Sequence, residues 1–201
     1  IKVIVGIRRC GKSSLLSLFH RELSKTGIDD GHIIDMNLES LRYRTLKDYL
    51  DFYDLVSSRI PSKGRTYLLF DEIQMIPHWE KAVESFRLDY DVDIYITGSN
   101  AYLLSNELST YLSGRYVEIK VYPLSFEEYC QFNHFDNTVS IHDKFNDYMR
   151  FGGMPVLASY KMDERLSHDA LEGIYSTVIL RDIMQRVPQC NQHTLEKIIR
   201  F

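Results

Sequence analysis

The sequence lacks the residues that mark disulfide-bonded, zinc-binding or membrane-spanning proteins. Its three cysteines, Cys10, Cys130 and Cys190, are far apart and form no Cys-x-x-Cys pair, so neither a disulfide framework nor a zinc site is indicated. The seven histidines include no metal-spaced pair such as His-Glu-x-x-His. No apolar run approaches the roughly 20 residues that span a bilayer, and no charged-then-apolar leader precedes the first strand. We therefore expect a cytoplasmic protein with no membrane partner.

A strong excess of charge is also missing. The net charge of −4 and the pI near 6.0 argue against a uniformly basic surface for nucleic acid. With 201 residues, 44% of them hydrophobic, the chain can bury one large core and a small second one. These values indicate a globular protein.

An octapeptide near the N-terminus fits the pattern of a phosphate-binding loop. Its glycines let the backbone turn with its N–H groups inward, and the helix that follows adds its positive N-terminal end. Lys12 would reach the β- and γ-phosphates and Ser13 would ligate Mg²⁺. A β-branched run at residues 1–5 and helically spaced leucines after the loop favour this interpretation over an unrelated glycine turn. The predicted nucleotide-binding residues are Gly6, Arg8, Arg9, Cys10, Gly11, Lys12, Ser13 and Ser14.

Strands and helices alternate along the first part of the chain. Strands are predicted at residues 1–5, 32–38, 67–70, 92–97 and 116–121, with helices after the loop and at 45–60 and 79–88. This alternation predicts an α/β fold with a doubly wound, mostly parallel, five-stranded sheet and ligand sites at the carboxyl ends of its strands. From about Ser125 the pattern becomes helical, so we expect one domain at 1–124 and a second at 125–201.

Two acids end the predicted third strand. Asp71 would hold Mg²⁺ through its water shell, and Glu72 would polarise the water that attacks the γ-phosphate. Glu39 is a competing base, because other phosphate-loop enzymes place their glutamate at the end of a neighbouring strand. We favour Glu72, since one strand end then explains both roles.

A polar turn follows the predicted fourth strand, in the segment Ile96-Thr97-Gly98-Ser99-Asn100. A hydroxyl or amide at Ser99 or Asn100 could orient the attacking water or contact the γ-phosphate. The same two residues could instead cap the helix that begins after them. Both interpretations stay open, and Asn100 is taken as a catalytic candidate.

These segments, in this order, resemble the prokaryotic AAA+ superfamily ATPases of the AAA_14/DUF4143-containing family. The resemblance covers nearly the whole chain and is most specific in Leu-Ser-Gly-Arg (112–115), Pro-Leu-Ser-Phe (123–126) and Gly-Gly-Met-Pro (152–155). It implies an AAA+ core of the P-loop type with ATP/ADP and Mg²⁺ as cofactors, Lys12 and Ser13 in Walker A and Asp71 and Glu72 in Walker B. It also implies sensor 1 at 99–100, a helical lid and a C-terminal winged-helix-like region beyond residue 201, which could bind DNA or a protein partner.

Three arginines are candidates for further phosphate contacts. Arg115 could act as an arginine finger, from a neighbouring subunit of a homo-oligomer, or could form a structural ion pair at the start of the fifth strand. Arg9 could contact the nucleotide or form a solvated loop face with Arg8. Arg181 could be a sensor in the lid or a partner in a helical salt bridge.

Two functions are consistent with the sequence. The first is Mg²⁺-dependent ATP hydrolysis that drives a conformational change of a C-terminal module. The alternative is a slow-turnover, STAND-like switch or scaffold whose output is partner binding. A GTPase is disfavoured because no Asn-Lys-x-Asp motif occurs. The aromatic residues of the second domain favour a packed core over a base-stacking surface.

Overall fold

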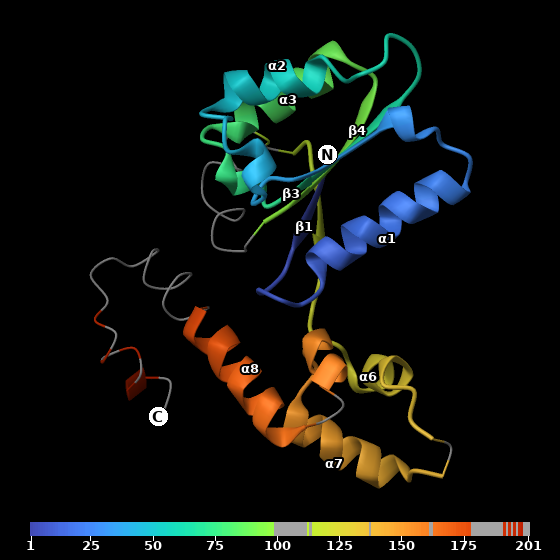
Figure 1. Ribbon diagram of the computed structural model, residues 1–201, viewed down its shortest axis with the longest axis vertical. Helices are drawn as coiled ribbons and strands as arrows, with labels where there is room; N and C mark the ends of the chain where they lie inside the picture. The colour runs from blue at the N-terminus through green and yellow to red at the C-terminus, as the bar shows by residue number, and fades with distance from the viewer. Residues whose placement is uncertain are drawn as a thin grey trace. The chain divides into compact units, whose positions relative to one another are not determined.

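The computed structural model describes residues 1–98, 112, 114–136, 138–160 and 163–177, together with residues 191, 193, 195, 197 and 198. The chain divides into two compact units, residues 1–6 with 12–120 and residues 7–11 with 121–201. The first unit is built on a β-sheet, and the elements of the second are helical (Figure 1). Among the described residues, no helix is both long and apolar enough to cross a bilayer.

Five strands form the sheet of the first unit. They are β1 (Lys2–Val5), β2 (Ile33–Asn37), β3 (Thr66–Asp71), β4 (Val92–Thr97) and β5 (Val117–Lys120). Their order is β2-β3-β4-β1-β5, and every neighbouring pair is parallel. The predicted five-stranded, mostly parallel sheet is therefore confirmed. Because β4 lies between β1 and β3, two segments far apart in sequence flank the same central strand.

Helices cover both faces of this sheet, as expected for a doubly wound fold. Figure 1 shows α1 (Lys12–Lys25) on one side and α2 (Tyr49–Ser57) with α3 (Trp79–Asp89) on the other. Asp48 starts α2, because its carboxylate accepts hydrogen bonds from the backbone N–H groups of residues 50 and 51. Short 3₁₀ turns, η1 (Asp30–His32), η2 (Leu41–Tyr43) and η3 (Ile73–Met75), complete the connections.

The core between the sheet and the α2–α3 layer is aromatic. Phe52, Phe70 and Phe86 are fully buried, and the Phe52 ring meets the Phe70 ring edge-on at 4.9 Å between centroids. Edge-to-face pairs add to the stabilisation that burial provides. This core fixes the positions of β3 and α3.

The second unit contains α6 (Phe126–Phe132), α7 (Ile141–Phe151), η4 (Pro155–Tyr160) and α8 (Glu164–Thr177). Ser125 and Glu128 form a capping box at the start of α6, and Ser140 caps α7. A small core of Phe151, Met154, Leu157 and Ile174 lies among these elements. A lid function for this unit stays a prediction.

Two of the segments that carry the family resemblance meet in this unit. The Leu124 backbone N–H donates to the Gly153 carbonyl at 2.7 Å, and the Tyr148 hydroxyl donates to the Leu124 carbonyl at 2.9 Å. A Cβ atom on Gly153 would lie 2.2 Å from the Leu124 carbonyl oxygen. Glycine is therefore required at 153, because no side chain fits against the Leu124 backbone.

Candidate functional site

Gly6, Asp71 and Glu72 lie at the carboxyl edge of the sheet, whereas Arg115 comes two residues before β5 and therefore lies at the opposite edge. β1, β3 and β4 are parallel and adjacent, so their carboxyl ends share one edge. Gly6 follows β1, Asp71 ends β3 and Thr97 ends β4. Because adjacent strands are about 4.8 Å apart, the axes of β1 and β3 are separated by about 10 Å. Gly6 and the acid pair thus lie on either side of β4.

The loop between β1 and α1 contains two residues with left-handed backbone. Gly11 has a φ of 107° and Arg9 a φ of 63°, and the Cys10 N–H donates to the Ile7 carbonyl at 3.3 Å. Glycine adopts such a φ at no steric cost, whereas arginine is strained there. Arg9 is exposed, Arg8 is half-buried and Cys10 is buried. The turn is local to residues 7–11, which belong to the second unit.

Lys12 opens α1 and is only 5% exposed. Its Nζ donates to the Gly6 carbonyl at 3.0 Å, so the side chain reaches back to the end of β1. Ser13 and Ser14 follow in the exposed first turn of the helix, where backbone N–H groups lack partners within the helix. The start of α1 therefore has the donors and the charge that a phosphate group needs.

Asp71 is 5% exposed and is held from the neighbouring strand. The Thr97 hydroxyl donates to its Oδ1 atom, and the same hydroxyl oxygen accepts the Glu72 backbone N–H at 3.2 Å. A buried carboxylate needs such hydrogen bonds to offset the loss of water. Thr97 thus links the Asp71 carboxylate and the Glu72 backbone to the end of β4.

Glu72 has a left-handed backbone, with φ 56° and ψ 50°. A non-glycine residue in this region costs about 1–3 kcal/mol and occurs often at functional sites. The Gln74 side-chain amide donates to the Glu72 Oε2 atom. The carboxylate is therefore held by a residue of the η3 turn that begins immediately after it.

The competing base also lies near this edge. β2 pairs with β3 so that Asn37 is opposite Asp71, and the Leu38 N–H donates to the Asp71 carbonyl at 3.0 Å. Glu39 follows two residues after β2 and is exposed, with its N–H bonded to the Asn37 side chain. The choice between Glu72 and Glu39 as the base stays a prediction.

Three of the predicted site positions lie outside the described residues, namely Ser99, Asn100 and Arg181. Arg115 is described and forms an ion pair with Glu84 of α3, with 2.6 Å between Nη1 and Oε1. A hydrogen bond from Arg87 is the largest of the causes that hold the pKa of Glu84 below its ordinary value, and Arg115 adds to it. Arg115 thus has the structural partner that one of the two interpretations expected.

Comparison with known proteins identifies the family of this chain. The sequence profile of AAA_14, an AAA domain, matches residues 1–130. The chain belongs to the AAA_14 family. The AAA_14 assignment and the sheet order together establish the P-loop ATPase fold, and with it a nucleotide-binding domain of the ATPase type.

Three curated relatives are uncharacterized proteins. One, from Haemophilus influenzae, is 43% identical over 203 residues, which cover all of this chain and 50% of the relative. The others, from Methanocaldococcus jannaschii, are 29% and 23% identical and cover 92% and 99% of this chain. The AAA_14 chain spans about half the length of these relatives or slightly less.

Solved structures resemble the chain more distantly. AMPPCP-bound DnaA from Aquifex aeolicus is 13% identical with a TM-score of 0.48, covering 94% of this chain and 60% of that one. Aeropyrum pernix ORC1 in complex with DNA is 13% identical with a TM-score of 0.46, covering 89% and 60%. Because both TM-scores are below 0.5, the fold of this AAA_14 protein rests on its sheet order and family.

Sequence reasoning about this AAA_14 protein missed Thr97 and Gln74 as partners of the acids. Thr97 lies in the segment 96–100, in which only Ser99 and Asn100 were predicted to contact the γ-phosphate or the attacking water. The sequence feature that could have identified Thr97 is a hydroxyl side chain at the last position of β4, the strand that pairs with β3. Gln74 gave no comparable signal, because only the left-handed Glu72 turns the chain so that the two side chains meet.

The donor atoms of the AAA_14 site fit Mg²⁺ bound with a nucleotide. The Asp71 carboxylate and the Ser13 hydroxyl are hard oxygen donors, which Mg²⁺ prefers. No group of three or more His, Cys, Asp or Glu side chains suited to a metal occurs in the part of the chain that the structure describes. Mg²⁺ commonly uses few protein ligands together with waters and substrate phosphates, so this donor set is suitable.

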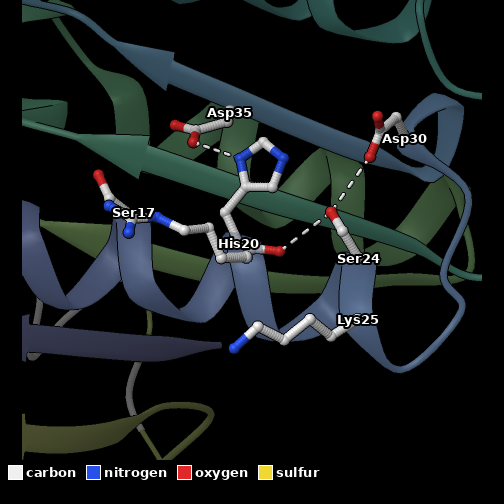
Figure 2. A pocket seen from close by; sticks show the side chains of 7 residues that line it. Ser17, His20, Ser24, Lys25, Asp30 and Asp35 are labelled. Carbon is white, nitrogen blue, oxygen red and sulfur yellow. Dashed lines mark hydrogen bonds and ion pairs between the residues drawn. The ribbon is translucent and has the colours of Figure 1, made fainter.

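A separate depression lies along α1, outside the predicted site (Figure 2). Its lining includes His20, Arg21 and Asp35. Figure 2 shows His20 directed at Asp35, with 2.7 Å between Nδ1 and Oδ2, and Ser24 directed at Asp30. Lys12 is eight residues before His20 in α1, which corresponds to about 12 Å along the helix. In this depression His20 pairs with Asp35, and Asp30 accepts a hydrogen bond from the Ser24 hydroxyl.

Proposed function

We propose that the intact protein binds ATP with Mg²⁺ at the carboxyl edge of this sheet and hydrolyses it to ADP and phosphate. The observation that carries the proposal is the arrangement of β1, β4 and β3. This arrangement brings Gly6, to which the Lys12 ammonium donates, and the Asp71–Glu72 pair to one edge. Ligands of open α/β sheets bind outside the carboxyl ends of the strands, which supports this location.

Each residue then has a defined task. The N–H groups of the loop and the Lys12 ammonium bind the β- and γ-phosphate oxygens and stabilise the charge that develops on them. Ser13 and Asp71 would hold Mg²⁺, which would neutralise phosphate charge when bound. Glu72 accepts a proton from the water that attacks the γ-phosphorus, and ADP leaves as the bond to the β,γ-bridging oxygen breaks.

The proposal is tested by replacing the two candidate bases in turn. We expect Glu72→Gln to lower the rate of phosphate release by roughly 10²- to 10⁴-fold, which is the usual contribution of a general base. The dissociation constant for MgATP should change little, since the amide keeps the shape of the side chain. Glu39→Gln is the matched control and should turn over normally. If phosphate release were normal in Glu72→Gln and abolished in Glu39→Gln, the general base would be Glu39.

The second unit supplies the candidate output. The relatives are about twice as long as this chain, and we propose that the additional length includes a C-terminal module that responds to the nucleotide state. We propose that 125–201 forms a helical lid which links that module to the ATPase core. A homo-oligomer, with Arg115 acting on a neighbouring site, is part of this proposal and requires release of the Arg115–Glu84 ion pair.

A slow switch is the second candidate. The hydrogen bond from Gln74 to Glu72 favours it, because a carboxylate held by a neighbour must exchange that bond before it accepts a proton. Turnover measured with and without DNA separates the candidates. DNA-stimulated hydrolysis supports a motor or remodeller, whereas negligible hydrolysis with ATP-dependent oligomerisation supports a switch.

A further inference from the structure

The hydroxyl of Thr97 occupies a central position between the two acids. Thr97 is the last residue of β4 and is fully buried, with 0% of its surface exposed. Its Oγ1 atom donates to Asp71 Oδ1 and accepts from the Glu72 backbone N–H. A hydroxyl group has one donor and two acceptor sites. One atom therefore serves both neighbours without conflict.

The register of the sheet explains this contact. Phe70 of β3 pairs with Ile96 of β4, so the next residues of the two strands, Asp71 and Thr97, are side by side at the carboxyl edge. The Glu72 N–H comes one residue later, where the chain leaves β3 with a left-handed backbone. The hydroxyl thus connects the end of one strand to the turn that follows its neighbour.

A buried threonine does not by itself require such partners. Thr66, the first residue of β3, is also 0% exposed, and its Oγ1 atom has no hydrogen-bond partner among the described residues. The two threonines have the same side chain and burial but lie at opposite ends of the sheet. The partners of Thr97 are therefore a property of the site edge, and Thr66 is its internal control.

We propose that Thr97 is a positioning residue that holds Asp71 and the Glu72 backbone in a fixed relation, so that both acids are presented together to the nucleotide. This proposal rests on the proposed function of the acid pair and assigns the residue that orients it. Hydrogen-bonding partners of metal-binding carboxylates fix their orientation. Thr97 itself need not touch the nucleotide.

The test compares three variants of the intact protein: Thr97→Val, Thr97→Ser and Thr66→Val. Valine has the shape of threonine without the hydroxyl, and serine keeps the hydroxyl. Three properties are measured: hydrogen exchange of the Glu72 amide without nucleotide, the Mg²⁺ concentration that half-saturates ATP binding, and kcat with KM for ATP. Thermal unfolding of each variant shows whether it is folded.

We expect Thr97→Val to accelerate exchange of the Glu72 amide, because its acceptor is gone. The half-saturating Mg²⁺ concentration should rise, and kcat should fall, each by roughly 10- to 100-fold, as for other partners of metal ligands. KM for ATP should stay within about threefold, since the loop and Lys12 are unchanged. Thr97→Ser should restore all three properties, and Thr66→Val should match the wild type in each.

Other outcomes overturn the proposal. If Thr97→Val is folded and keeps wild-type exchange, Mg²⁺ dependence and kcat, Thr97 has no positioning role. If Thr97→Ser is as impaired as Thr97→Val, the hydroxyl is not the cause and the proposal also fails.

Failure of the proposed function gives a different result. Wild-type protein that binds MgATP without turnover would remove hydrolysis, while Mg²⁺ dependence and Glu72 exchange would still decide the role of Thr97. Wild-type protein that binds no MgATP would remove both proposals.

Discussion

The two units bury their aromatic residues to different extents. In the first unit Phe52, Phe70 and Phe86 form one fully buried cluster under the sheet. In the second, the rings of Phe126 and Phe145 pack edge-on at 5.2 Å between centroids, yet 46% of Phe145 is exposed. A rigid core allows acids at a strand end to keep their geometry, whereas loosely packed elements open more readily. We therefore expect the first unit to hold its geometry more rigidly and the second unit to open more readily.

The largest expected effect comes from removing a ring of the first unit. Phe70→Ala should lower the free energy of unfolding by about 3–5 kcal/mol, because it leaves a cavity in a closed core. Phe145→Ala removes the same atoms from a half-exposed position and should cost less than about 1.5 kcal/mol, mainly its pairing with Phe126. Hydrogen exchange of peptides from both units, with urea unfolding, measures the two losses. Equal losses would show that the units do not differ in packing.

A pair of glycine substitutions tests the second unit in more detail. Gly153→Ala places a Cβ atom 2.2 Å from the Leu124 carbonyl oxygen, and relieving this overlap should cost about 1–3 kcal/mol. Gly173 lies in α8, where a Cβ atom meets nothing within 4 Å. Gly173→Ala should therefore raise the free energy of unfolding by about 0.5–1 kcal/mol.

Exchange of peptides from 121–157 should accelerate in Gly153→Ala, while peptides of the sheet keep their wild-type rates. Equal acceleration of hydrogen exchange in peptides of the sheet would contradict the expectation that the second unit opens independently of the first. No change in Gly153→Ala would show that the Leu124 backbone can move without cost.

The regular elements of the first unit were predictable because their signals are local. The apolar runs Ile94-Tyr95-Ile96 and Tyr67-Leu68-Leu69-Phe70 are visible in the sequence, and the observed β4 has the predicted bounds. The helix predicted at 45–60 begins later, at Tyr49, because the Asp48 side chain caps it by accepting hydrogen bonds from the N–H groups of residues 50 and 51. The fold prediction was therefore confirmed with small shifts at the ends.

The candidate site was predictable only in part. Lys12 and the Asp71–Glu72 pair follow from residue types at fixed spacing. The partners of the acids do not, because Thr97 reaches Asp71 only through the insertion of β4 beside β3 and the exact register between them. The Arg115–Glu84 ion pair also joins residues 31 positions apart. Such contacts depend on topology, which local periodicity does not contain.

The smallest expected effect concerns two tyrosines, one in each unit. Burial is the largest of the causes that raise the pKa of Tyr129 in the second unit to about 12. A hydrogen bond with Asp89, 2.7 Å from the hydroxyl, is the largest cause that raises the pKa of Tyr53 in the first unit to about 12. A raised pKa means that the folded state favours the neutral phenol. This contribution to stability is complete below about pH 10 and is lost as the pH rises through about 12.

Substitution by phenylalanine separates these two causes. The Tyr129 hydroxyl is buried and has no hydrogen-bond partner among the described residues, so Tyr129→Phe should be neutral or stabilising by up to about 1 kcal/mol at pH 7. Tyr53→Phe loses its bond to Asp89 and should destabilise by a few tenths of a kcal/mol, because the pair is exposed. In urea unfolding between pH 9 and pH 12, each variant should lose less stability than the wild type as the pH rises. If Tyr129→Phe lost as much stability between pH 9 and pH 12 as the wild type, ionisation of the buried Tyr129 phenol would not be the cause of the alkaline loss.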